Sequence, residues 1–157
     1  MKRLHLLVFG VLALAVAAAA WSGWRLYSRQ AAEGDHAAAV AAARQFTIDF
    51  VSISASTVDS DIQRVTSAAT GDFAGEYTRG KTQVRAAVVE NAVQSEGTVL
   101  RAGLVSGDSD SAVVLVAVDA NVKNVKAPQG RPAHYRIKVE MVKEEGRWLV
   151  SKLEFVG

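Results

Sequence analysis

Few side chains in this sequence could carry acid–base chemistry, and they are widely separated along the chain. Its 157 residues include 3 histidines and 16 acidic residues, and no cysteine. The absence of cysteine excludes disulfides, thiolate metal ligands and a cysteine nucleophile. A histidine beside a carboxylate remains as an arrangement for general acid–base catalysis, because imidazole titrates near neutral pH. The residues considered for such chemistry are His134, the last histidine of the chain, and, separately, Asp119 among the carboxylates.

The pattern around His134 indicates that its side chain faces solvent. Apolar and polar residues alternate from Tyr135 to Met141, which is typical of a half-buried strand. His134 is therefore predicted on the surface, since it has the parity of Arg136, Lys138 and Glu140. Asp119 could face a pocket, but a polar outer face of its own strand accounts for it equally well. A catalytic pair, and therefore an enzyme, is not expected.

The other acidic residues have structural explanations. Asp59 and Asp61 fit the cap and first turn of a short helix, and Asp72 fits the cap of another. Asp108 and Asp110 belong to a turn, "SGDSD", that lacks the third ligand, the glycine and the terminal glutamate of a calcium loop. The sequence has no phosphate-binding glycine loop and no Gly-x-Ser-x-Gly nucleophile elbow. No cofactor and no metal ion are expected.

The first apolar segment predicts a membrane anchor. Residues 4–24 contain no Lys, Arg, Asp or Glu, and a helix of this length rises roughly 30 Å, the thickness of a bilayer core. Basic residues flank the segment on both sides. We therefore predict a short tail at 1–3 and a transmembrane helix at 4–24, whose anchoring residues are Leu4, Leu7, Val11, Leu14, Trp21 and Trp24.

A cleaved signal peptide is the alternative to an anchor. Residues 18–20 are alanines, which suit a cleavage site. The length of the apolar run and the bulky Trp21 favour an uncleaved span. The short tail favours export of the C-terminal part, so we expect a single-pass protein of the inner cell membrane with its C-terminal domain on the extracytoplasmic side.

The basic balance of the chain comes from the flanks of this segment. The formal net charge is +2, but Lys2, Arg3, Arg25 and Arg29 precede the first acidic residue, Glu33. The rest of the chain is mildly acidic and mixes both signs of charge. Because no basic stripe is interleaved with aromatic residues, nucleic acid is not an expected partner.

Residues 25–34 are predicted to be a linker, and residues 35–157 a single domain. Helix patterns cover 36–54, a segment that begins at Thr57 or Asp59 and ends at 68, about 73–80, and 82–93; the first carries an apolar stripe at Ala39, Ala43, Phe46, Phe50 and Ile53. Strand patterns cover 97–105, 112–122, 135–141 and 148–156. Two prolines and a glycine predict a loop over 124–133. Helices followed by antiparallel strands indicate an α+β fold, with about three helices packed on a curved sheet of about four strands.

The apolar residues of this sheet have two interpretations. They form the core against the helices, or some of them line a pocket for a lipid. The candidates for such a pocket are Val116, Val118, Ile137, Val139, Met141, Leu153 and Phe155.

The ending "YRIKVEMVKEEGRWLVSKLEFV", after a helix-rich half, resembles the cone-shaped NTF2-like (SnoaL-like) fold, whose members often end on a strand, a glycine turn and Trp-Leu-Val. With its short tail, apolar span and alanine-rich helix, the whole chain is similar to the Mce-associated membrane proteins of actinobacteria. The resemblance has no catalytic residues to carry over. It implies a non-catalytic, membrane-anchored accessory subunit that docks on and stabilises an Mce-type lipid-transport complex of the cell envelope.

The resemblance implies the bilayer and an Mce or permease-type protein complex as partners, with a lipid as a further candidate. An inner-membrane subunit of a conjugation or secretion machine is the main alternative, because some such subunits share one span and an NTF2-like domain. An NTF2-like enzyme or a lipid-binding domain is the less favoured alternative.

Overall fold

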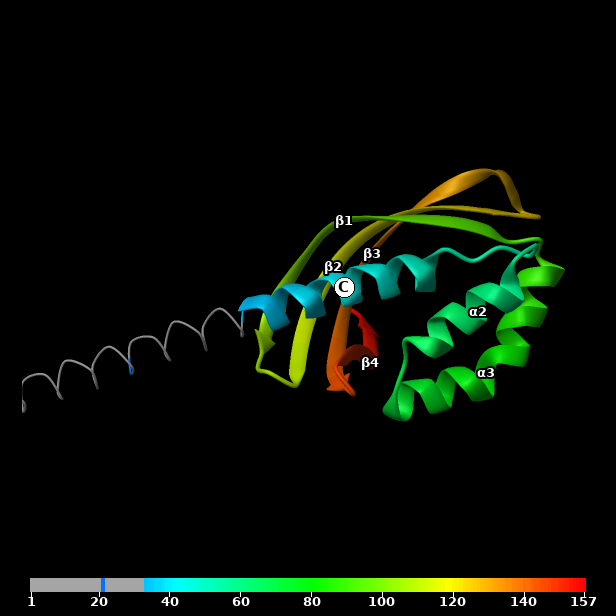
Figure 1. Ribbon diagram of the computed structural model, residues 1–157. Coiled ribbons are helices and arrows are strands. Elements are labelled where there is room, and N and C mark those ends of the chain that lie inside the picture. Colours follow the sequence, from blue (N-terminus) through cyan, green and yellow to red (C-terminus); the bar gives the residue numbers. More distant parts are fainter. Residues whose placement is uncertain (1–20, 22–32) are drawn as a thin grey trace, which may run out of the picture. The chain divides into compact units, whose positions relative to one another are not determined.

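A computed structural model describes residue 21 and residues 33–157, and the chain divides into two units, Met1–Asp35 and His36–Gly157 (Figure 1). The predicted span at 4–24 lies outside the described residues except for Trp21, which is helical and 61% exposed. Among the described residues, no helix has the length and hydropathy needed to cross a membrane. The second unit contains the whole sheet and nearly all of the described residues.

The first described helix covers residues 33–51 and lies along the inner side of the curved sheet (Figure 1). Ala39 and Ala43 are completely buried and Phe46 is almost so, which confirms the first part of the predicted stripe. Phe50 is half-buried, and Ile53 lies beyond the end of the helix. Small alanines on the buried side allow the helix backbone to approach the sheet closely.

Two further helices, α2 (Val58–Ser67) and α3 (Gly71–Glu90), complete the helical half. The prediction of two helices over 73–80 and 82–93 is wrong, because α3 runs without a break through Gly75 and Gly80. A glycine inside a helix costs only about 1 kcal/mol, which packing of Phe73 and Tyr77 against the core offsets. Gly71 does separate α2 from α3, and its positive φ of 56° suits glycine.

Four antiparallel strands form one sheet in the order β1-β2-β3-β4: β1 (Gln94–Gly107), β2 (Ser111–Asn124), β3 (Ala127–Glu144) and β4 (Arg147–Phe155). The predicted α+β class is confirmed, with three helices and four strands in the described part of the chain. The segment at residues 68–70 also pairs with the free side of β4, since Thr70 N donates to Val150 O at 2.8 Å.

The predicted loop at 124–133 is wrong, because β2 and β3 continue through it and only Val125 and Lys126 form the turn. The sheet tolerates Pro128 and Pro132 because β4 pairs with β3 only from Ile137 onward. Residues 127–136 therefore have a strand on one side alone, and an edge position suits a residue without an N–H.

The inner face of the sheet is filled by core side chains. Residues of β2, β3 and β4 are 0% exposed there: Val114, Val116, Val118, Ile137, Val139 and Val150. Burying each such side chain stabilises the fold by about 1.5–3 kcal/mol. A set of aromatic rings with centroids 5.7–6.3 Å apart packs at one end of this core: Phe46, Phe50, Phe73, Tyr77, Tyr135 and Phe155.

The seven candidates for a lipid pocket occupy different places in this core. Five of them, Val116, Val118, Ile137, Val139 and Met141, are at most 2% exposed. Leu153 is partly buried against the same cluster, and Phe155 is 58% exposed at the edge of the aromatic set. A lipid on the inner face would therefore have to displace the helix at 33–51 or reach the core past Phe155.

Candidate docking surface

The side of the sheet opposite the core carries no helix in the described part of the chain (Figure 1). We call this side the outer face. In β2 it bears the residues that alternate with the buried valines, namely Val113, Leu115, Ala117 and Asp119. Three large apolar side chains of β1 and β2 remain exposed, with exposed fractions of 47% for Leu100, 65% for Val105 and 41% for Leu115.

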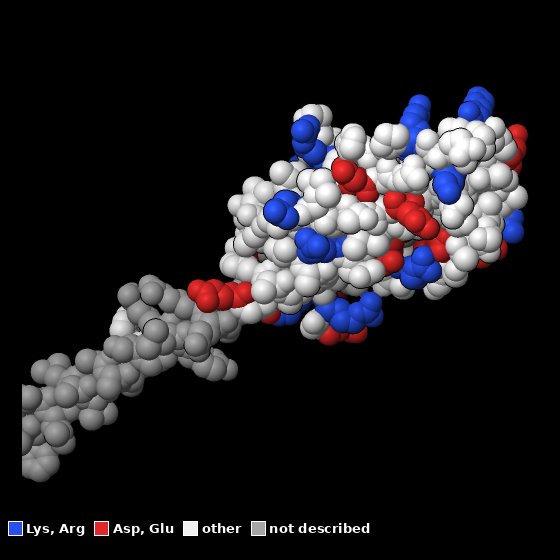
Figure 2. Space-filling model, turned by 90° about the horizontal axis from the view of Figure 1, so that it is seen from above, with Lys and Arg blue, Asp and Glu red and all other residues white. Residues whose placement is uncertain are grey.

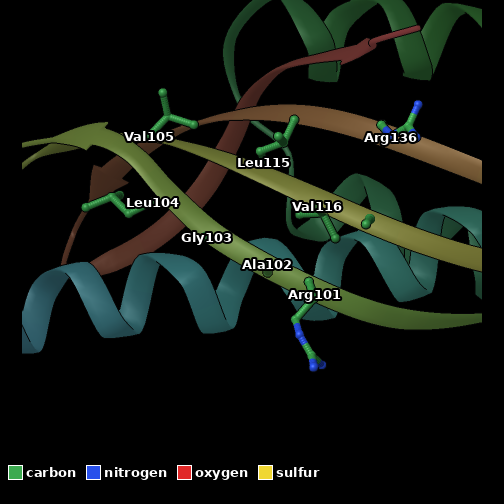
Figure 3. Close-up of a pocket in the computed structure, with 9 residues that line it drawn as sticks. Arg101, Ala102, Gly103, Leu104, Val105, Leu115, Val116 and Arg136 are labelled. Carbon is green, nitrogen blue, oxygen red and sulfur yellow. The ribbon is translucent and has the colours of Figure 1, made fainter.

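A shallow groove of about 440 Å³ crosses this part of the sheet; we call it the outer groove. Residues 101–105 of β1, residues 115–117 of β2 and Arg136 of β3 line it. Figure 3 shows Val105, Leu115 and Arg136 projecting to one side of the strands and Val116 to the other. The register of β1 against β2 shifts at Val99/Arg101 and again at Leu104/Ser106. Such bulges bend a strand, and they flank the groove on β1.

A second hollow, of about 440 Å³, adjoins the outer groove through Ala117 and Arg136. Asp119 and His134 line it as direct partners on β2 and β3. His134 Nδ1 lies 2.7 Å from Asp119 Oδ1, and the two side chains are 73% and 43% exposed. The prediction of a surface position for His134 is confirmed, but its pairing with Asp119 was not foreseen. An open hollow that leaves both groups in water does not enclose a substrate around a general base.

Beyond the groove the sheet carries a network of opposite charges. Glu154 lies 2.5 Å from Lys138 Nζ and 2.6 Å from Lys152 Nζ, and Glu140 lies 3.6–3.8 Å from both ammonium groups. Hydrogen bonds from the two lysines lower the pKa of Glu154 to about 2. Two cations and two anions compensate one another, so this part of the sheet offers no net charge to a ligand.

The other predicted acidic residues lie in a turn or in the first turn of a helix, and their contacts are structural. Asp108 Oδ1 accepts the backbone N–H groups of Asp110 and Ser111 at 2.9 and 2.7 Å, which confirms the hairpin turn. These bonds lower the pKa of Asp108. Asp59 pairs with Arg85 at 2.8 Å, whereas Asp61 is buried and hydrogen-bonded on both oxygens. Among the described residues, no three His, Asp or Glu side chains are grouped as metal ligands.

The exposed apolar residues of the outer face were not predicted as a site. The sequence did contain a signal, because residues 113–118, "VVLVAV", are apolar at both parities. The even-numbered residues of this segment are buried in the core, and the odd-numbered residues, Leu115 among them, lie on the outer face. A strand that is apolar on both faces is buried on both or exposes one of them to a partner.

Sequence comparisons connect the chain with mycobacterial proteins. The sequence model of the family described as "Uncharacterized protein Rv1363c/MT1408-like" matches residues 5–157. The chain is 31% identical to protein Rv1363c of Mycobacterium tuberculosis over 133 residues, covering 85% of this chain and 51% of that protein. It is 32% identical over 123 residues to the outer membrane protein Rv1973 of the same organism, covering 75% and 74%. The chain thus spans about half the length of Rv1363c.

Structural comparisons place the domain among NTF2-like folds. The periplasmic domain of DotI superposes with a TM-score of 0.62 at 9% identity, covering 74% of this chain and 91% of that one. An "Ntf2 like protein involved in plasmid conjugation" gives 0.52 at 16% identity, covering 76% and 48%. At these identities the likeness concerns the fold alone. The predicted NTF2-like fold is confirmed, whereas the link to Mce complexes stays a prediction.

Proposed function

The chain belongs to the Rv1363c/MT1408-like family, and we propose that it is a membrane-anchored accessory subunit without catalytic activity. It docks on and stabilises a protein complex of the cell envelope. The observation that carries the proposal is the outer face, where Val105 and Leu115 are exposed in the outer groove and Leu100 is exposed in the adjoining hollow. Contiguous exposed apolar side chains in a folded domain mark interaction sites.

The two faces of the sheet differ in what they offer to a ligand. An NTF2-like enzyme requires a pocket on the inner face, and there the side chains of Val116, Ile137 and Val139 are fully buried. The His134–Asp119 pair is on the outer face, exposed to water. Docking requires only a surface, and an anchored domain meets co-resident partners at high effective concentration.

We assign an Mce-type lipid-transport complex as the partner, because the similarity to Mce-associated membrane proteins extends over the whole chain. The predicted span at 4–24 anchors the subunit in the inner membrane, and the domain lies on the extracytoplasmic side. A secretion or conjugation machine is the second candidate. The fold likeness to the periplasmic domain of DotI and to a plasmid-conjugation protein favours it.

Paired substitutions test docking through the outer face. Leu115→Glu places a charge beside the outer groove. Val89→Glu is the control and places the same charge on α3. The two sites are similarly exposed, because the exposed fraction is 41% for Leu115 and 46% for Val89. Tagged full-length protein is recovered from cross-linked membranes, and its partners are identified by mass spectrometry. We expect L115E to lose the complex and V89E to retain it, at equal protein levels.

The identity of the recovered subunits separates the two candidates. Mce and permease subunits support the first, and subunits of a secretion machine support the second. Wild-type protein that is recovered alone from cross-linked membranes contradicts the proposal. Equal recovery of partners by L115E and the wild type shows that docking uses another surface.

A further inference from the structure

The hairpin that joins β2 to β3 has an excess of positive charge. We call residues 120–133 the basic arm; it contains Lys123, Lys126 and Arg131, and no acidic residue occurs from 120 to 136. All three cations are exposed. Glu90 of α3 and Glu96 of β1 belong to the same end of the domain, but among the described residues no carboxylate lies within 4.0 Å of the three cations. These charges are therefore available to a partner.

The three cations point to different sides of the arm. Lys123 pairs with Gln94 and has the parity of the outer face, whereas Arg131 pairs with Val122 and has the parity of the inner face. Lys126 is in the turn, next to Val125, whose side chain is 60% exposed. A flat anionic surface would contact only one of these sides at a time, whereas a cleft would contact all of them.

The free edge of the arm is unsuited to strand addition. Val156 N donates to Arg136 O at 2.8 Å, which shows that residues of even number turn their backbone groups to this edge. Pro132 shares that parity and offers no N–H there, and Pro128 also lacks an N–H on this edge strand. Prolines on an edge strand prevent pairing with another chain. Side-chain charge is therefore the principal means by which the arm can bind.

The arm lies at the end of the domain away from the beginning of the first helix. That helix starts beside the turn between β1 and β2 and ends beside the first residues of β1 (Figure 1). Ser95 Oγ donates to Val51 O at 2.6 Å at this second end, and Val125 N donates to Asn91 O at 3.0 Å. Figure 2 shows Lys and Arg side chains projecting around the right-hand end of the domain, together with some Asp and Glu side chains.

We propose that the basic arm inserts into an acidic cleft of a partner protein. Cations on both faces and at the turn match a cleft lined by carboxylates, and the exposed Val125 supplies an apolar contact at the tip. Electrostatic attraction of this kind accelerates association and is weakened by salt, because exposed charges are screened over about 8–10 Å at physiological ionic strength. This contact is separate from the outer groove and does not depend on docking there.

The absence of cysteine makes a direct test possible, because Val125→Cys creates a single labelling site. The full-length V125C protein in neutral detergent carries an environment-sensitive fluorophore, and the probe is a peptide of ten glutamates. We expect saturable binding that weakens with salt. The triple variant K123Q/K126Q/R131Q should bind about tenfold more weakly, as expected for three exposed charge pairs. The control R44Q/R79Q/K81Q removes the same charge from exposed sites elsewhere and should change the affinity less than twofold.

Three outcomes overturn the proposal. The label at residue 125 does not respond to the peptide, or the control variant weakens binding as much as the arm variant does. The third is a larger response to nanodiscs that contain phosphatidylglycerol than to the peptide, which assigns the arm to an anionic membrane. Unchanged thermal unfolding of both triple variants, followed by circular dichroism, shows that the fold is intact.

Discussion

Asp61 of α2 is the described acidic residue whose loss should affect the fold most. Its side chain is buried, and Oδ2 accepts hydrogen bonds from Ser54 N at 2.9 Å and Thr57 Oγ1 at 2.8 Å. Oδ1 accepts one from Arg64 Nη2 at 2.7 Å. This carboxylate therefore joins the start of α2 to the segment that leaves the first helix. Its charge also raises the pKa of Tyr77, although burial of the phenol is the larger cause.

Two substitutions at this position should differ in a graded way. In Asp61→Asn the amide oxygen can still accept from Ser54 and Thr57, so the main loss is the charged bond from Arg64, about 1.5 kcal/mol. In Asp61→Ala the backbone N–H of Ser54 also loses its acceptor in a partly buried place, which brings the total to about 3 kcal/mol. For a domain of this size these losses lower the melting temperature by about 5 °C and 10 °C.

The measurement is thermal unfolding of the full-length protein in detergent, followed by circular dichroism. Asp59→Asn is the matched control, because Asp59 is in the same turn but its side chain is 74% exposed in its pair with Arg85. D59N should leave the melting temperature almost unchanged. In D61N the pKa of Tyr77 should fall toward its usual value, measured by phenolate absorbance. Equal melting temperatures for D61A and D59N would refute the reasoning.

Two more substitutions probe close packing and the surface charges. In Gly97→Ala the new Cβ would lie 2.1 Å from Val51 Cγ2, so we expect a loss of about 1–3 kcal/mol in thermal unfolding; the double variant with Val51→Ala should recover part of it, and a neutral G97A would contradict the packing. Glu154 has a folded-state pKa of about 2 against an ordinary value of 4.5, so its stabilising effect is complete above pH 4.5 and is lost as the pH falls toward 2. Glu154→Gln should therefore unfold with a smaller pH dependence between pH 4.5 and 2 than the wild type, and identical pH profiles would show that its pairs with Lys138 and Lys152 do not affect folding.

The sequence allowed the order of elements and the inner face of the sheet to be predicted, because both depend on local periodicity. The buried parity of β2 and the stripe at Ala39, Ala43 and Phe46 are of this kind. The helix–helix boundary at Gly80 was wrong, since helix propensity alone cannot weigh the tertiary contacts that keep α3 continuous. Membrane crossing by residues 4–24 stays a prediction.

The pairing of Asp119 with His134 could not be predicted once residues 124–133 had been interpreted as a loop. The turn at Val125 and Lys126 places Asn124 opposite Ala127, and an irregularity between Val122 and Asn124 then shifts the register so that Asp119 faces His134. Prolines argue against a central strand, and the sequence did not reveal that this half of β3 lacks a second neighbour. The hydrogen bonds of Asp61 were missed for a similar reason, because Ser54 is brought to it by a bend outside the helix.

The close approach of the first helix to the sheet explains why the outer surfaces are the ones available for binding. Ala39 and Ala43 are fully buried against the sheet, and a larger separation would be needed to leave a pocket between them and the valines of β2. Because these helix residues are small, the helix backbone lies close to the sheet and leaves no space between the two. The exposed surfaces include the outer face, with the apolar residues around its groove, and the basic arm beyond it. If both proposals hold, the domain makes two separate contacts with other proteins, one apolar and one electrostatic, and we expect substitutions to remove each of them without disturbing the core.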